Sequence, residues 1–448
     1  MDTDMTEGRI LPTILKFMIP LLIGNIVQQL YNMADTVIVG RCLGANALAA
    51  VGSTGTIMFL VVGFAQGLTA GFTVLTSQCY GAHEFGRVKR SVQNGIILSI
   101  AVAVLVTVIS SISMRPLLNL MNTPDEIFSM AYTYIMIICL GSSATVFNNL
   151  FSSFLRAVGN SIMPLFFLIF SACLNVALDL LFILGFSTGV GGAAAATVIA
   201  QGISALLCYI YIRRRMPVLW PSNFTFTLTR ADTEHQLRIG IPMALQFAIT
   251  ASGTMIMQAA INICGAAAVA AYTAASKIGS LLMQGMISMG QAMATYCGQN
   301  YGKGDFRRIT SGVKKAVLAE IIYSVGAGAL GLLLLSPALS LFFSADTDMT
   351  EIYPMALIYM RMSVTFYIPL SLIFLFRNAM QGCGYSLLPM LGGVVELIAR
   401  LAAAAAAIHL KSYTLAVFCD PAAWLAAGVF LTFAYIYVRR DMKKNMEA

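Results

Sequence analysis

Long apolar stretches recur from Ile14 to Val438 and constrain the fold more than any other feature of the chain. Each is long enough to cross a hydrocarbon core, which takes about 20 residues of helix. Of the 448 residues, 58% are hydrophobic and 10% are charged, against roughly 25% charged in soluble domains. We count twelve stretches, which predict an all-α polytopic membrane protein. Their ranges are 14–39, 47–76, 91–114, 128–150, 162–185, 192–212, 236–264, 268–297, 313–336, 353–376, 387–409 and 421–438.

Basic residues cluster at the termini and in every second loop, whereas the alternate loops are richer in acids. By the positive-inside rule, both termini are then cytoplasmic and the number of spans is even. The net charge of +8 therefore reflects topology rather than nucleic acid binding. The N-terminus lacks a cleavage site of small residues and runs into the first span, so we expect no removable signal. These features predict a multi-pass protein of the inner (cytoplasmic) membrane.

The nine cysteines contain no CxxC pair and the three histidines are dispersed. This pattern predicts neither a structural metal site nor a disulfide framework. No nucleophile, metal-ligand set or acid pair with a base stands at the aqueous boundary, so we expect no enzyme activity and no cofactor beyond a transported ion.

The two halves of the chain resemble each other at a nearly constant offset. The stretch "QCYGAHEFGRV" from Gln78 matches "QNYGKGDFRRI" from Gln299, 221 residues later. Both copies lie in basic loops, so the halves have the same orientation, as in transporters built from parallel repeats. We predict two pseudo-symmetric six-helix lobes around a central cavity, over residues 1–212 and 236–448, with a cytoplasmic linker over 213–235.

Polar residues form single faces on several predicted spans, and two of these faces carry an aspartate. On the first span the polar side chains recur at intervals of three or four residues, as do those on the fifth. The two faces consist of Asn25, Gln28, Asn32 and Asp35, and of Ser171, Asn175 and Asp179. Counted along helices, Asp35, Asp179, Thr197 and Tyr134 lie at one depth, roughly 6–10 Å inside the outer ends of their spans.

Two carboxylates with amide and hydroxyl oxygens at one level suit a small hard cation, and they suit a proton equally well. An acid within the membrane is costly and is by default a functional hypothesis. The alternative is that these groups are hydrogen-bonding glue between helices. Further oxygen ligands for such a cation-coupling site could come from Gln28, Asn32, Asn149 and Ser152.

The second half differs chemically from the first. Glu396 and Arg400 are spaced i to i+4 and can neutralise each other, as a structural ion pair or in a cavity or gate. Glu320 follows Lys314 and Lys315 closely, and we interpret it as interfacial. Lys277 has no partner evident in the sequence, and whether it lines the cavity stays open.

Four stretches carry a family resemblance. "MADTVIVGRCLGANALAAVG", "LRAVGNSIMP", "LNVALDLLFILG" and "GVGGAAAAT" resemble the multidrug and toxic compound extrusion (MATE) transporters, closest to their prokaryotic, DinF-like branch. The resemblance covers all twelve spans. It implies two six-helix lobes that export cationic, amphipathic compounds in exchange for protons or sodium ions.

The resemblance also implies an ion site in the first lobe. The family's site residues carry over onto Asp35, Asn175, Asp179 and Thr197, and Tyr134 matches as well. Where several members have an asparagine on the fourth helix, this chain has Ser152, with Asn148 and Asn149 one turn earlier. The carboxylate that some members carry on the seventh helix is absent, with Thr250 close to its place, which argues against a second-lobe ion site.

The sequence thus predicts a cation-coupled multidrug efflux antiporter, working as a monomer in the lipid bilayer on small organic cations. The main alternative is a flippase for a lipid-linked precursor, whose anionic head group would call for several cavity arginines or lysines. A passive channel is a further alternative, although repeated lobes and an unpaired acid pair fit alternating access better.

Overall fold

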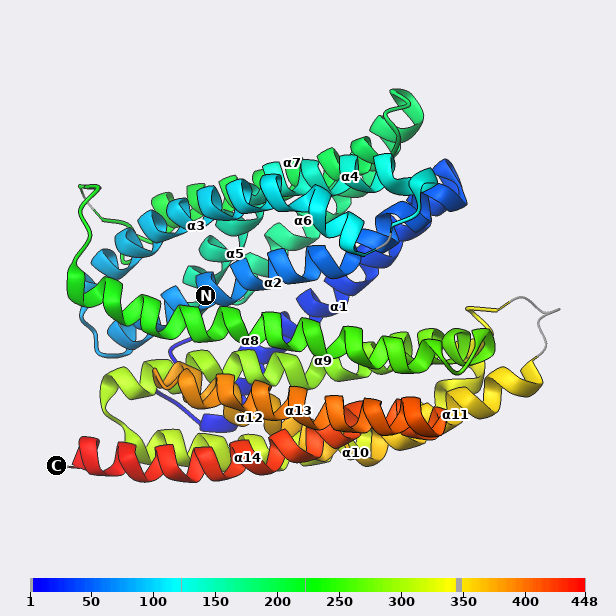
Figure 1. The fold of residues 1–448 in the computed structure, drawn as a ribbon. Helices are drawn as coiled ribbons and strands as arrows, with labels where there is room; N and C mark the ends of the chain where they lie inside the picture. Colours follow the sequence, from blue (N-terminus) through cyan, green and yellow to red (C-terminus); the bar gives the residue numbers. More distant parts are fainter. Residues whose placement is uncertain (1–2, 122, 222, 344–348, 448) are drawn as a thin grey trace. The chain divides into compact units, whose positions relative to one another are not determined.

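The computed structural model describes residues 3–121, 123–221, 223–343 and 349–447. Within these ranges the chain consists of helices joined by short loops, with no strand (Figure 1). The helices are α1 (Ile10–Leu43), α2 (Ala45–Gly81), α3 (Phe85–Leu120), α4 (Asp125–Leu140), α5 (Ser142–Ala157), α6 (Ile162–Leu180), the π-helical turn η1 (Leu181–Gly185), α7 (Gly189–Arg215), α8 (Arg230–Asn262), α9 (Ala266–Lys303), α10 (Phe306–Leu339), α11 (Met349–Thr365), α12 (Tyr367–Gly382), α13 (Leu387–Leu410) and α14 (Tyr413–Glu447).

Among the described residues, ten helical segments are long and apolar enough to cross a membrane, and two bent helix pairs pass the same test together. The pair α4 and α5 bends by 47°, and the pair α11 and α12 bends by 49°. With each pair counted as one span there are twelve, which confirms the predicted all-α polytopic fold. Sequence periodicity predicted unbroken spans over 128–150 and 353–376, and the bends are a correction. The first break falls at Gly141, where a Cβ would collide with the methyl groups of Val198.

The contacts divide the chain into two compact units. Unit 1 contains Met1–Met5 and Ile19–Phe247, and unit 2 contains Thr6–Met18 and Ala248–Ala448. The boundary at Phe247 lies inside α8, whereas the sequence suggested a division at the linker over 213–235. Both α1 and α8 therefore contribute one part to each unit.

Small residues explain why the first half of α8 belongs to unit 1. A Cβ placed on Gly67 of α2 would lie 2.7 Å from the Cα of Ala244, and one on Gly71 would collide with the backbone of Gly240. Such close backbone approach is how helices gain packing energy where the hydrophobic effect between helices is weak. The crossing of α2 and α8 therefore depends on glycine at position 71.

Gly71→Ala is expected to destabilise unit 1 by about 1–3 kcal/mol, the usual cost of inserting a methyl group into a packed contact. Gly55→Ala, on the same helix, is the matched control, because no atom lies within 4 Å of the position its Cβ would take. Thermal unfolding of the purified variants in detergent measures the difference. Equal melting temperatures for the two variants would contradict this account of the crossing.

The segment between α7 and α8 is attached to unit 1 rather than loosely suspended. The Gln93 amide donates to the Thr227 carbonyl oxygen at 3.1 Å and to the Thr225 hydroxyl at 3.1 Å. The Asn94 amide donates to the Thr229 carbonyl oxygen at 3.3 Å and accepts from the Thr229 backbone N–H at 3.3 Å. Two side chains of α3 thus hold the end of the predicted linker in place.

Candidate cation-coupling site

Two carboxyl groups meet inside unit 1. Asp35 lies two turns before the end of α1, and Asp179 lies at the end of α6, just before η1. Their side chains lie close enough to interact directly, and each has its Oδ1 atom buried without a hydrogen-bond partner. Two ionised carboxylates repel each other at such range unless a proton or another cation lies between them. The pair therefore has both the charge and the free oxygens to hold one.

Asn175 and Thr197 complete one side of this cluster. Asn175, one turn before Asp179 on α6, is fully buried. With its amide turned to match donors with acceptors, its nitrogen donates to Asp179 Oδ2 at 2.8 Å and its oxygen accepts from the Thr197 hydroxyl at 3.3 Å. The Thr197 hydroxyl also lies 3.1 Å from the carbonyl oxygen of Ala193. The amide thus orients one carboxylate of the pair.

Two tyrosines close the other side. Tyr134 of α4 is 2% exposed, and its phenol lies within electrostatic reach of Asp35, Asp179 and Tyr31. The Tyr31 phenol lies beside Thr197 and near both aspartates. Sequence reasoning missed Tyr31, although its i to i+4 spacing with Asp35 on α1 places both residues on one face.

The structure therefore brings together the five residues predicted for the core of this site. Tyr134 packs in an apolar cluster with Val39, Ile138 and Ile183, which shields the polar groups from that side. Within the described residues, no ion pair joins Asp35 or Asp179 to a basic side chain. The π-helical turn that follows Asp179 is typical of functional sites.

Within the described residues, no hydrogen bond joins the four additional ligand candidates to Asp35 or Asp179. Gln28 donates to Asn32 at 3.3 Å along α1. Ser152 contacts the Cys208 thiol at 3.8 Å, and Asn149 forms no hydrogen bond within the described residues. The contact of Ser152 with Cys208 therefore joins the polar face of α5 to α7.

In unit 2, Glu396 and Arg400 form the expected ion pair at 3.3 Å, but they belong to a larger network. Arg377 of α12 pairs with Glu396 at 3.1 Å, and Arg400 pairs with Asp420 of α14 at 2.8 Å. The predicted spans over 353–376 and 421–438 leave Arg377 and Asp420 just outside, in loops, and the structure corrects this because both lie within helices. Two arginines and two acids make the network electrically neutral.

Lys277 and Glu320, the two other charged candidates of unit 2, differ in exposure. The side chain of Lys277 on α9 is exposed. Glu320 on α10 is 2% exposed, so its side chain is buried within unit 2, and the interfacial position that we inferred from Lys314 and Lys315 stays a prediction. Both lysines are exposed and do not reach its carboxylate.

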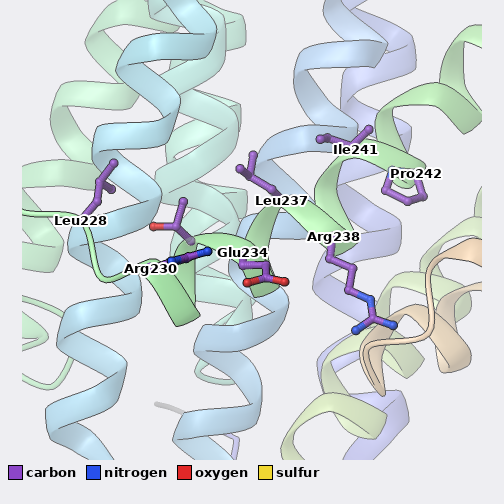
Figure 2. Close-up of a pocket in the computed structure, with 8 residues that line it drawn as sticks. Leu228, Arg230, Glu234, Leu237, Arg238, Ile241 and Pro242 are labelled. Atoms are coloured by element: carbon purple, nitrogen blue, oxygen red, sulfur yellow. The ribbon is translucent and has the colours of Figure 1, made fainter.

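A pocket of about 800 Å³ lies elsewhere in unit 1, along the first turns of α8 (Figure 2). Arg230, Glu234 and Arg238 line it with several apolar side chains. It contains none of the residues predicted for the cation site, so the pocket and the carboxyl pair are separate features.

Ten to twelve candidate membrane spans in the described residues, with a buried carboxyl pair in unit 1, are the features of a membrane transporter. The chain belongs to the MatE family, whose sequence model matches residues 20–181 and 242–405.

Individual relatives agree with this assignment. The probable multidrug resistance protein YoeA of Bacillus subtilis is 28% identical, over 68% of each chain. The probable multidrug resistance protein NorM of Thermotoga maritima is 25% identical, over 84% of this chain and 81% of its own. The crystal structure of MATE in complex with MaL6 superposes with a TM-score of 0.91 at 20% identity and covers 99% of both chains, which shows the shared fold.

Proposed function

We propose that this MATE transporter is a secondary active antiporter that exports cationic, amphipathic compounds in exchange for protons or sodium ions. The observation that carries the proposal is the contact between Asp35 and Asp179, with two buried carboxyl oxygens left without partners. A cation drives export only if it binds differently in the outward-facing and inward-facing states. A carboxyl pair that holds one cation at a time can supply a binding site of this kind.

Asp35, Asp179 and Asn175 would bind the ion directly, while Thr197, Tyr31 and Tyr134 position them. The multidrug resistance proteins among the relatives support small organic compounds as substrates. A flippase fits less well, because the buried Arg377 and Arg400 are both held by carboxylates and are not free to bind an anionic head group. We also propose that the protein works as a monomer in the inner membrane, with both termini cytoplasmic, as the basic loops favour.

Transport by reconstituted vesicles tests the proposal. Purified protein is inserted into vesicles, and movement of a cationic dye is followed under a proton gradient alone and then under a sodium gradient alone. We expect one of the two gradients to drive dye uphill. Dye movement that follows only its own concentration gradient in both experiments would refute antiport and favour a passive channel.

A further inference from the structure

Glu320 lies in the middle of a long membrane helix of unit 2. It stands roughly 20 Å from one end of α10 and roughly 28 Å from the other, at 1.5 Å per residue. Its side chain is 2% exposed, and its Oε2 atom is buried without a hydrogen-bond partner. A carboxylate buried among protein atoms needs a neutralising partner.

No charged side chain supplies that partner within the described residues. The helices α9, α11, α12 and α14 pack against α10, and none of their charged groups acts on the carboxyl of Glu320. The ionisable group within its electrostatic reach is the Tyr323 phenol on its own helix. Tyr323 already donates its proton to the Leu282 carbonyl oxygen at 2.8 Å.

The neighbouring helix ends carry further unsatisfied polar groups. Ser324, one turn after Glu320, donates to the Tyr367 carbonyl oxygen at 3.4 Å. The Tyr367 hydroxyl and the Ser363 hydroxyl are both buried without a partner. Ser324 thus ties α10 to the start of α12 one turn after Glu320.

An isolated buried carboxylate is too costly to stay ionised, and such a group becomes neutral by holding a proton. We propose that Glu320 is a second proton-binding site, in unit 2, whose loading and release contribute to the transport cycle. The proposal rests on the gradient-driven exchange proposed above, but it uses none of the residues of the Asp35–Asp179 site. It departs from the expectation, drawn from the missing carboxylate on the seventh helix, that the second lobe has no ion site.

The internal repeat provides a matched control. The position 221 residues before Glu320 is Ser99 of α3, which is fully buried and whose hydroxyl also has no partner. A serine hydroxyl does not ionise near neutral pH, so it carries no proton site that a pH gradient could load and empty. Ser99→Ala thus removes an unpartnered buried polar group at the matching place in unit 1 without removing a proton site.

The deciding experiment measures how far vesicles concentrate a cationic dye at equilibrium, under a difference of one pH unit with the membrane potential clamped at zero. Each exchanged proton multiplies the attainable concentration ratio about tenfold per pH unit, so Glu320→Gln should lower the ratio about tenfold. Glutamine mimics the protonated side chain, and Ser99→Ala should keep the wild-type ratio. A wild-type ratio in Glu320→Gln would overturn the proposal. It would show that Glu320 keeps its proton throughout the transport cycle.

Failure of the two proposals can be told apart. If the wild type concentrates no dye under any gradient, antiport itself fails. If Glu320→Gln does not fold, labelling of the wild type with dicyclohexylcarbodiimide, which reacts with protonated carboxyl groups in membranes, still gives an answer. We expect labelling of Glu320 to fall as pH rises and to persist in Asp35→Asn, and labelling that does not change with pH would overturn the proposal.

Discussion

Asp35→Asn is expected to insert and fold but to lose export against a gradient. The amide is nearly the same shape as the carboxyl group, and it removes a charge that the membrane disfavours. It cannot bind and release a proton, and it no longer gives the pair with Asp179 the negative charge that holds a cation. Each charge moved through the full membrane potential supplies about 2.3 kcal/mol per 100 mV, which the variant would forfeit.

Asp179→Asn should behave in the same way, and the double variant should be little worse than either, because residues of one site are not additive. Asp125→Asn is the control, since Asp125 is exposed at the start of α4. The measurement is dye efflux from cells that contain equal amounts of each variant. Wild-type efflux by Asp35→Asn would move the coupling site elsewhere.

Arg400→Met is expected to cause the largest loss of stability in unit 2. Arg400 is 3% exposed and reaches Glu396 at 3.3 Å and Asp420 at 2.8 Å. Removing it leaves Asp420 without its basic partner, whereas Glu396 keeps Arg377. Breaking a buried pair by removing one partner costs about 3–5 kcal/mol, because a desolvated charge is left uncompensated.

The exposed Arg361 of α11 provides the matched control, since Arg361→Met also removes one guanidinium from unit 2. Thermal unfolding in detergent should show a lower melting temperature for Arg400→Met and little change for Arg361→Met. Adding Asp420→Asn to Arg400→Met should restore part of the loss, because the unpaired charge is then gone. No recovery in the double variant would show that packing of the Arg400 side chain, rather than charge, accounts for the effect.

The fold class followed from local patterns alone. Apolar stretches of membrane length predict helices because hydrocarbon allows no unsatisfied backbone, and the repeat of the Gln78 loop at Gln299 predicts two related halves. The bend at α4–α5 did not follow, since Gly141 is explained by a distant contact with Val198. Glycine is too common in membrane helices to mark such a contact in the sequence. The bend at α11–α12 could have been predicted, because Pro369, three residues after the break at Phe366, has no N–H to bond the end of α11.

At the carboxyl site, too, the sequence predicted relations within one helix but not contacts between helices. Helical spacing places Asn175 with Asp179 on one face, because that relation lies within one helix. Spacing cannot tell which of several polar faces meet, so it proposed Ser152 and Asn149 beside Asp35 and missed Tyr31. In unit 2 it found the pair of Glu396 with Arg400, four residues apart, but not Arg377 or Asp420. Those partners lie on other helices. Only the packing of whole helices brings Arg377 to 3.1 Å from Glu396 and Asp420 to 2.8 Å from Arg400.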